Sequence, residues 1–226
     1  MKANEKTMIV DEEFDLFLVP YREEHVAKYH DWMLSPELRE LTASEPLSLD
    51  EEYEMQRKWQ LDEDKLTFII CVRSRAAIDP RSTTIEDISS SSSSLLPPKI
   101  TLEMIGDVNL FLKGDQHDED FEVEAEIMVA EPHHRRRGLG LRALQLLFSY
   151  ATSPDSPAPL PVSPKVLVAR IGETNLSSQN LFEKLGFVVT KRVAVFEEVE
   201  MRFRGDVEDW PRGSVQVYDQ TIYTFC

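Results

Sequence analysis

The stretch 126-EIMVAEPHHRRRGLGLRALQLLF-148 places three consecutive arginines and a Gly-Leu-Gly triplet between two segments of different hydrophobic pattern. The residues before this corner alternate between apolar and polar as in a β-strand, and those after it are apolar with a helical period. Unpaired N–H groups at a helix amino terminus bind anions, glycine lets an anion approach them, and arginine suits phosphate oxygens. The stretch therefore predicts a diphosphate site, formed by Arg135, Arg136, Arg137, Gly138, Leu139 and Gly140.

Two other phosphate-binding motifs do not fit this corner. A dinucleotide-binding Gly-x-Gly-x-x-Gly motif would need glycine where the chain has Ala143, and no Gly-Lys-Ser/Thr of a Walker loop follows. A structural interpretation stays open beside the diphosphate site. In that interpretation both glycines allow tight packing of the helix, and the arginines form a solvated basic patch.

The composition limits the partners of this chain. Its 226 residues contain 25 Lys and Arg against 41 Asp and Glu, a formal net charge of −16. A negative field of this size repels nucleic acid and anionic membranes, so we expect neither as a partner. No apolar run approaches the about 18 residues of a membrane helix, so we expect a cytoplasmic protein, with the nucleus as the alternative. Cys71 and Cys226 offer no metal-ligand spacing, and we expect no metal.

Seven segments have the pattern or composition of β-strands, and four have the period of a helix. The expected strands are 14–20, 66–72, 104–112, 121–130, 166–171, 187–196 and 198–203. The expected helices are 22–34, 50–61, 139–152 and 176–185. This order predicts a single α/β domain over residues 14–204, with a mixed central sheet of about seven strands flanked by about four helices.

Three segments fall outside this pattern. Residues 74–99 include six consecutive serines and a Pro-Pro pair, which predict a disordered insertion between two strands. Residues 153–164 hold five prolines and predict an extended spacer. Residues 205–226 form a C-terminal tail whose strand-like ends have no derivable place in the sheet.

We call residues 135–140 the arginine corner. A second motif, 175-NLSSQNLFEKLGF-187, begins about forty residues after the start of that corner. In this order and spacing the two motifs resemble the GNAT acetyltransferase superfamily, and the resemblance covers residues 14–204. More narrowly, 16-LFLVPYREEHV-26 and 122-EVEAEIMVAEPHHRRRGLGLRAL-144 resemble the N-acetyltransferase 9-like branch of that superfamily.

The resemblance implies acetyl-CoA as the acetyl donor. The pyrophosphate would bind the N–H groups of the arginine corner, with Arg135 in the family's Gln/Arg position. The pantetheine arm would pair like an added strand along Ile127, Met128 and Val129, with the Val129 N–H near the acetyl oxygen. Asn175 and Ser178 match positions that contact the cofactor arm. For Asn175 a simple helix cap is an equal alternative.

Family members pass the acetyl group directly to an amine within a ternary complex, so a base and an acid are needed. We expect Glu126 to be the base, because it lies beside the thioester in a row with Glu122 and Glu124 that raises its pKa and attracts a cationic amine. The alternative is that this row only faces solvent. His133 and His134 lie nearby, but a surface turn explains them better.

The position of the family's usual general-acid tyrosine holds Phe182, which has no proton to donate. We expect the Phe182 ring to face the cofactor and the departing thiolate to take its proton elsewhere. Two functions follow. The first is N-acetylation of an amine, on a protein or peptide. The alternative is a catalytically weak GNAT-fold module that binds acyl-CoA and a basic, cytoskeletal partner.

Overall fold

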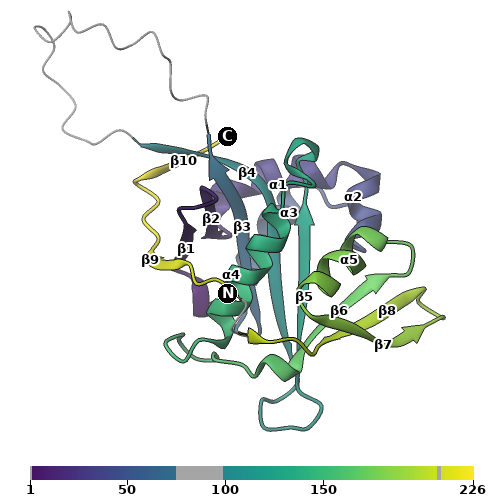
Figure 1. Cartoon of the computed structure of the whole chain (residues 1–226). Helices are drawn as coiled ribbons and strands as arrows, with labels where there is room; N and C mark the ends of the chain where they lie inside the picture. Colours follow the sequence, from purple (N-terminus) through teal and green to yellow (C-terminus); the bar gives the residue numbers. More distant parts are fainter. Residues whose placement is uncertain (1, 75–98, 208–209) are drawn as a thin grey trace, which may run out of the picture.

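The computed structural model describes residues 2–74, 99–207 and 210–226, which form one sheet with helices on both faces (Figure 1). Its strands are β1 (Thr7–Asp11), β2 (Leu16–Pro20), β3 (Lys65–Arg73), β4 (Ile100–Lys113), β5 (Glu122–Val129), β6 (Leu167–Gly172), β7 (Phe187–Val193), β8 (Glu198–Phe203), β9 (Ser214–Val217) and β10 (Tyr223–Phe225). Its α-helices are α1 (Val26–Met33), α2 (Pro36–Leu41), α3 (Leu49–Leu61), α4 (Leu139–Thr152) and α5 (Leu176–Lys184).

The sheet is mixed. Its strands follow the order β7-β8-β6-β5-β4-β3-β2-β1-β9, and β10 pairs in parallel with the first residues of β4. The pairing of β5 with β6 is parallel as well, whereas the other neighbours in this order run antiparallel. The predicted mixed α/β class is confirmed.

Two apolar clusters fill the two faces of the sheet, because side chains alternate between the faces along each strand. Helices α4 and α5 cover one cluster, which includes Leu144, Leu147, Phe148 and Phe182. Helices α1 to α3 cover the other, which includes Tyr29. The two interfaces bury the apolar sides of these helices, and this burial is the main force that holds them on the sheet.

The sheet has more strands than the about seven predicted. Ten strands occur in the described chain, and the three additional ones are β1, β9 and β10. The described chain has five α-helices where about four were predicted, and the additional one is α2. Ser35 caps α2 by accepting a hydrogen bond from the Leu38 N–H. Ser35 and Pro36 are a recognisable helix start, so this signal was present in the sequence.

The ends of the chain also join the sheet beyond the predicted domain limits of 14–204. β1 lies before residue 14, and the predicted tail 205–226 supplies β9 and β10. Trp210 of that tail is buried, with its ring centroid 4.7 Å from that of Phe203. The predicted spacer 153–164 has no helix or strand before Pro164, and the predicted insertion lies outside the described residues from 75 to 98.

Candidate active site

Strands β5 and β6 separate near the middle of the sheet (Figure 1). They pair at Val123↔Leu167 and Glu124↔Val168, and no later pair joins them in the described chain. β5 continues to pair with β4 as far as Val129. The carboxyl end of β5 therefore has a partner on one edge only.

The free edge of β5 carries the backbone groups predicted to bind the cofactor arm. N–H groups alternate in direction along a strand, and the Ala130 N–H donates to Ile105 on the β4 side. The Val129 N–H therefore points toward β6. An extended chain can add to such an edge, so the geometry suits the predicted contacts with Ile127, Met128 and Val129. These contacts stay predictions.

The arginine corner turns directly into the amino terminus of α4. Arg136 and Gly138 both have positive φ, 59° and 82°. Alternation of left-handed residues with ordinary ones turns successive N–H groups toward one point, which makes a concave anion site. A Cβ added to Gly138 would meet no atom within 4 Å, so the space in front of this backbone is open. The corner thus fits a diphosphate on backbone N–H groups, Leu139 included.

Gly140 has a different reason to be glycine. A Cβ there would lie 3.3 Å from Ile127 Cδ1 and 3.4 Å from Val129 Cγ2. Gly140 therefore lets α4 pack closely on β5. Of the two interpretations of the glycines, open backbone applies to Gly138 and tight packing applies to Gly140.

The side chain of Arg135 holds the corner against β5. Its Nε donates to the Val129 carbonyl at 2.8 Å, and its Nη2 donates to the Ala130 carbonyl at 3.1 Å. Its Nη1 also lies 3.6 Å from Glu37 Oε1. Arg135 therefore fixes the turn, and in this structure its guanidinium is engaged with the backbone.

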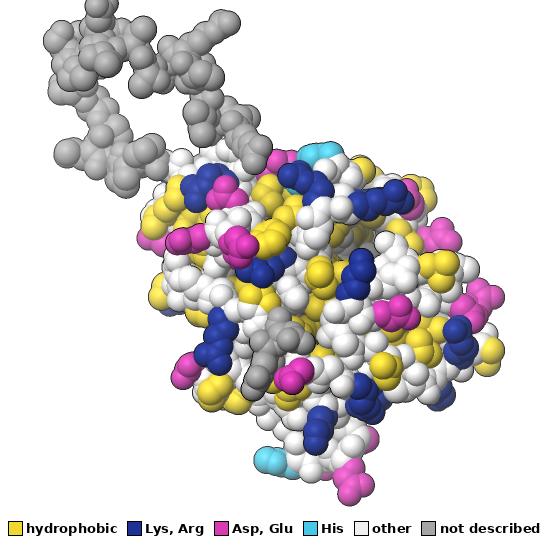
Figure 2. Space-filling view, in the orientation of Figure 1, with side chains coloured by type: hydrophobic (Ala, Val, Ile, Leu, Met, Phe, Trp, Pro, Cys, Tyr) yellow, Lys and Arg dark blue, Asp and Glu magenta, His cyan; other side chains and the backbone are white. Residues whose placement is uncertain are grey.

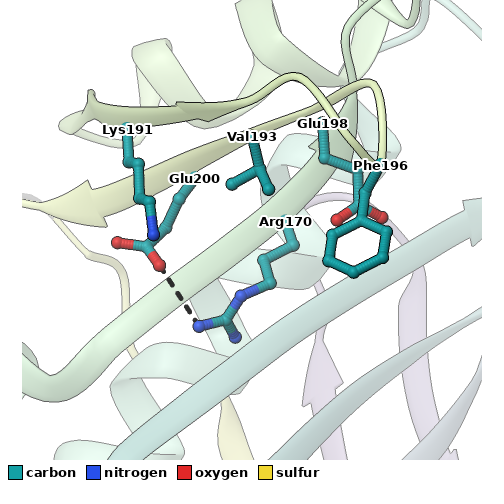
Figure 3. Close-up of a pocket in the computed structure, with 6 residues that line it drawn as sticks. All are labelled: Arg170, Lys191, Val193, Phe196, Glu198 and Glu200. Carbon is teal, nitrogen blue, oxygen red and sulfur yellow. Dashed lines mark hydrogen bonds and ion pairs between the residues drawn. The ribbon is translucent and has the colours of Figure 1, made fainter.

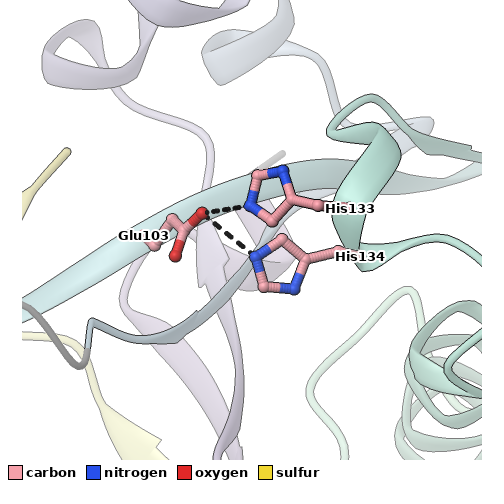
Figure 4. Close-up of side chains that lie close together, drawn as sticks. All are labelled: Glu103, His133 and His134. Atoms are coloured by element: carbon pink, nitrogen blue, oxygen red, sulfur yellow. Dashed lines mark hydrogen bonds and ion pairs between the residues drawn. The ribbon is translucent and has the colours of Figure 1, made fainter.

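His133 and His134 both contact Glu103 of β4 (Figure 4). Their Nε2 atoms lie 2.9 Å and 3.0 Å from Glu103 Oε1. These three residues could hold a metal ion, since their ligand atoms lie within 4.8 Å of one another. Arg137 Nη1 lies 3.3 Å from His134 Nδ1, and because arginine only donates, His134 carries its proton on Nε2. In that tautomer His134 donates to Glu103 and braces the arginine corner.

Asn175 caps helix α5. Its side-chain oxygen accepts a hydrogen bond from the Ser178 N–H at 3.1 Å. The helix-cap interpretation of Asn175 is therefore observed, while its contact with the cofactor, and that of Ser178, stay predictions. The cap fixes the start of α5 beside α4, where Leu181 Cδ2 lies 3.8 Å from a Cβ built on Gly140.

The expectation that the Phe182 ring faces the cofactor is wrong in this structure. Phe182 is 2% exposed, and its ring meets Phe187 edge-on, with centroids 5.1 Å apart. It belongs to the apolar cluster beneath α4 and α5. Burial of the apolar ring in this cluster is favourable, which explains why the ring lies in the core and not toward the cofactor side.

The glutamate row of β5 is largely neutralised, which the sequence did not predict. Arg170 of β6 forms ion pairs with Glu122, Glu124 and Glu200, and Arg202 of β8 pairs with Glu122 at 2.9 Å. The three glutamates are therefore not a bare acidic face. Sequence reasoning missed both arginines because β6 and β8 meet this face only through strand pairing.

A shallow cavity of about 260 Å³ lies beside this ion-pair network. It is lined by Arg170, Lys191, Val193, Phe196, Glu198 and Glu200 (Figure 3). The cavity lies over β6, β8 and β7, on the sheet face that carries Glu124 and Glu126.

Glu126 differs from the other two glutamates, because no ion pair within the described residues neutralises it. Solvent reaches its side chain, but the surrounding protein removes much of its hydration. This desolvation, together with the nearby Glu124 carboxylate, raises the pKa of Glu126 to about 7, and Lys65 opposes the shift. A carboxylate with this pKa is suited to take up a proton near neutral pH. Its role as the base stays a prediction.

The face of the molecule that α4 covers does not carry charge of one sign only (Figure 2). On the face that α4 covers, Lys and Arg side chains lie among Asp and Glu side chains and scattered apolar ones (Figure 2). Among the described residues, no helix has the length and apolar character needed to cross a bilayer.

Comparison with known proteins agrees with this geometry. Residues 15–188 match the family model described as an acetyltransferase (GNAT) domain. The chain is 39% identical over 210 residues to an alpha/beta-tubulin-N-acetyltransferase 9 of Drosophila melanogaster, covering 93% of this chain and 92% of the relative. It is 42% identical to the mouse protein of that name, covering 89% of this chain and 73% of the relative.

A solved structure shares the fold. The spermidine N-acetyltransferase of Vibrio cholerae, determined with CoA and spermine, superposes with a TM-score of 0.56 at 17% identity and covers 83% of this chain and 93% of its own. The matched domain contains the separated strands, the arginine corner and the motif of α5 described above. This chain is therefore a member of the GNAT acetyltransferase family, an acetyl-CoA-dependent N-acetyltransferase.

Proposed function

We propose that this chain acetylates an amine of a protein in the cytoplasm, with tubulin subunits as the acceptor. The relatives from fly and mouse carry tubulin in their names, and both align over most of this chain. The observation that carries the donor half of the proposal is the open concave backbone at Arg136 and Gly138, beside the free edge of β5.

Acetyl-CoA supplies an activated acetyl group as a thioester. The N–H groups of the corner and of α4 would hold its diphosphate, and the Val129 N–H would donate to the carbonyl oxygen where negative charge develops. Such a donor stabilises the transition state more than the ground state.

The acceptor amine must lose a proton to react. Its nitrogen lone pair attacks the thioester carbon, the C–N bond forms, and the C–S bond breaks. Glu126 takes the proton from the amine, and the thiolate takes one from solvent. Phe182 has no hydroxyl to offer that second proton, and its ring is buried.

The test is incubation of purified αβ-tubulin and of a peptide library with the protein and acetyl-CoA, read by mass spectrometry. We expect one added acetyl group on a tubulin subunit. Acetylation of library peptides without any acetylation of tubulin would refute tubulin as the acceptor and keep the protein-amine proposal. No product from any acceptor, with acetyl-CoA bound, would refute both.

The lack of a hydroxyl at Phe182 favours one second candidate, a slow enzyme that acts mainly as a binding module. The two differ in turnover. Saturable binding of acetyl-CoA and of tubulin, with no acetylated product in a prolonged incubation, would establish the binding module.

A further inference from the structure

The face of the sheet under α1 and α3 holds a second carboxylate, that of Asp107 on β4, which is not among the predicted site residues. Asp107 is 2% exposed. Asn109 Nδ2 donates to its Oδ2 at 2.6 Å, whereas its Oδ1 is buried without a hydrogen-bond partner among the described residues. Burying a carboxylate oxygen without a hydrogen-bond partner costs free energy of folding. A bound ligand or a proton at that oxygen would lower this cost.

A short hydrogen-bond chain fixes the orientation of Asp107. Thr67 Oγ1 on β3 donates to Asn109 Oδ1 at 2.7 Å, which turns the Asn109 amide toward Asp107. Thr67 and Asn109 are both buried and lie opposite each other in register. The chain therefore holds Asp107 Oδ2 and directs Oδ1 away from Asn109.

Strand register places Asp107 next to the reacting end of β5. Asp107 lies opposite Met128, and Gly106 lies opposite Val129. A Cβ on Gly106 would lie 1.9 Å from the Met128 carbonyl oxygen, so the two strands approach closely there. Asp107 is thus one register position from Val129, whose N–H is predicted to meet the acetyl oxygen.

Glu126 lies on the same face, diagonal to Asp107, because its partner in register is Asn109. Solvent reaches Glu126, whereas Asp107 is enclosed. The two carboxylates therefore form an outer and an inner group that can accept hydrogen bonds, Glu126 on β5 and Asp107 on β4.

No cation in the described chain pairs directly with either carboxylate. The basic side chain that affects the pKa of both carboxylates is Lys65 of β3. Its Nζ lies over the rings of Trp59, at 2.8 Å from the centroid, and of Phe111, at 4.2 Å. The Nζ of Lys65 is thus directed at aromatic rings, and neither carboxylate has an ion-pair partner among the described residues.

We propose that Asp107 is a catalytic residue of the acceptor site, which receives the primary ammonium of the acceptor together with Glu126 and holds it beside Val129. This inference rests on the proposed function. The ammonium meets Glu126 first and then donates to Asp107 Oδ1. One proton of the ammonium passes to Glu126 before the attack, which frees the nitrogen lone pair. As the C–N bond forms and the C–S bond breaks, the nitrogen loses a second proton to Asp107, and the thiolate takes a proton from solvent. Thr67 and Asn109 are positioning residues, because they act through Asp107.

Titration of the two carboxylates agrees with this role. Burial raises the pKa of Asp107 to about 6, against the opposing effects of Asn109 and Lys65. The charged and titratable groups that act on the pair are Lys65, Lys113, Glu124, Tyr21 and Tyr29. Removing the charge of Asp107 lowers the pKa of Glu126, because Asp107 is one of the charges that raise it.

The experiment compares Asp107→Asn with Asp118→Asn, the same change in an exposed turn. Steady-state acetylation is measured from pH 5.5 to 8.5 on two peptides, one with a free α-amine and no lysine, the other blocked at its terminus with one lysine. We expect Asp107→Asn to lose about 10²-fold or more in kcat/KM for the acceptor, the lower range of acid–base catalysis. Its Kd for acetyl-CoA stays unchanged, and the rise of activity with pH moves to lower pH.

The two peptides distinguish an α-amine from a lysine as the source of the ammonium. If Asp107→Asn does not fold, Thr67→Val and Thr67→Ser replace it. We expect about a tenfold loss in kcat/KM for Thr67→Val and recovery in Thr67→Ser, which keeps the hydroxyl. Unchanged kinetics and pH profile in these variants, with an active parent protein, would overturn the role of Asp107 alone. A parent protein that acetylates neither these peptides nor tubulin would overturn the proposed function and this inference with it.

Discussion

Replacing Phe182 by tyrosine restores the hydroxyl that the family's general acid carries, and the structure predicts that it does not help. The ring is 2% exposed and lies edge-on to Phe187, with centroids 5.1 Å apart. Among the described residues, the buried polar side-chain atoms that lack a hydrogen-bond partner belong to residues outside the apolar cluster of Phe182. None of them is therefore available to pair with the new hydroxyl.

The cost follows from this burial. An unsatisfied buried hydroxyl costs about 1–3 kcal/mol in the free energy of unfolding. For a chain of this size that corresponds to a Tm lower by about 2–12 °C. The turnover number should not rise, because the hydroxyl points into the apolar cluster under α4 and α5.

The assay is a pair of measurements on one preparation, a melting curve and steady-state acetylation of tubulin. Phe14→Tyr is the control, since Phe14 is 40% exposed and its new hydroxyl is solvated. If Phe182→Tyr keeps the parent Tm and raises kcat by about 10²-fold or more, the magnitude expected of a general acid, the ring faces the thiolate and this reasoning is wrong.

Three further predictions concern the cofactor, the base and the ion-pair network. Acetyl-CoA at about 100 times its Kd should stabilise the protein by ~2.7 kcal/mol; Gly138→Asp should abolish the accompanying rise in Tm, because it places a carboxylate before the anion site, and a retained rise would contradict that site. Activity should increase as pH rises through about 7, where Glu126 loses its proton, and Glu126→Gln should remove this limb of the pH profile; a limb that persists in the variant would assign it to another group. Arg170→Met should lower stability by about 1.5–3 kcal/mol in urea unfolding, as expected for hydrogen bonds to charged groups. Arg192→Met, which breaks an exposed pair with Glu173, should change it by less than about 1 kcal/mol, and equal losses would refute the distinction.

Much of the site could be predicted from short segments of the chain. The order of strand, arginine corner and helix at Arg135 to Gly140 predicts an anion site because glycine conformation and helix N–H groups act locally. Ser48 and Asn175 likewise predict helix starts, and both side chains accept hydrogen bonds from the N–H groups three residues later. The backbone within a few residues decides these features.

Other features depend on residues that are distant in sequence. Nothing near 122–126 indicates that Arg170 and Arg202 neutralise Glu122 and Glu124, because β6 and β8 reach that face only once the sheet has formed. β9 lies in a strand-like part of the tail, but its pairing with β1 could not be predicted from the sequence, because the two strands meet only in the folded chain.

The sequence by itself determined the family and the order of the central elements, and it predicted the donor site, since each rests on local backbone geometry and on motif spacing. Only the tertiary structure decided that the Phe182 ring lies in the core and that Asp107 lies diagonal to Glu126 in register, with one oxygen that has no hydrogen-bond partner among the described residues. The physical reason is that burial and strand register are properties of the assembled sheet. Burial and strand register determine which side chains come into contact, and therefore which carboxylates have a basic partner.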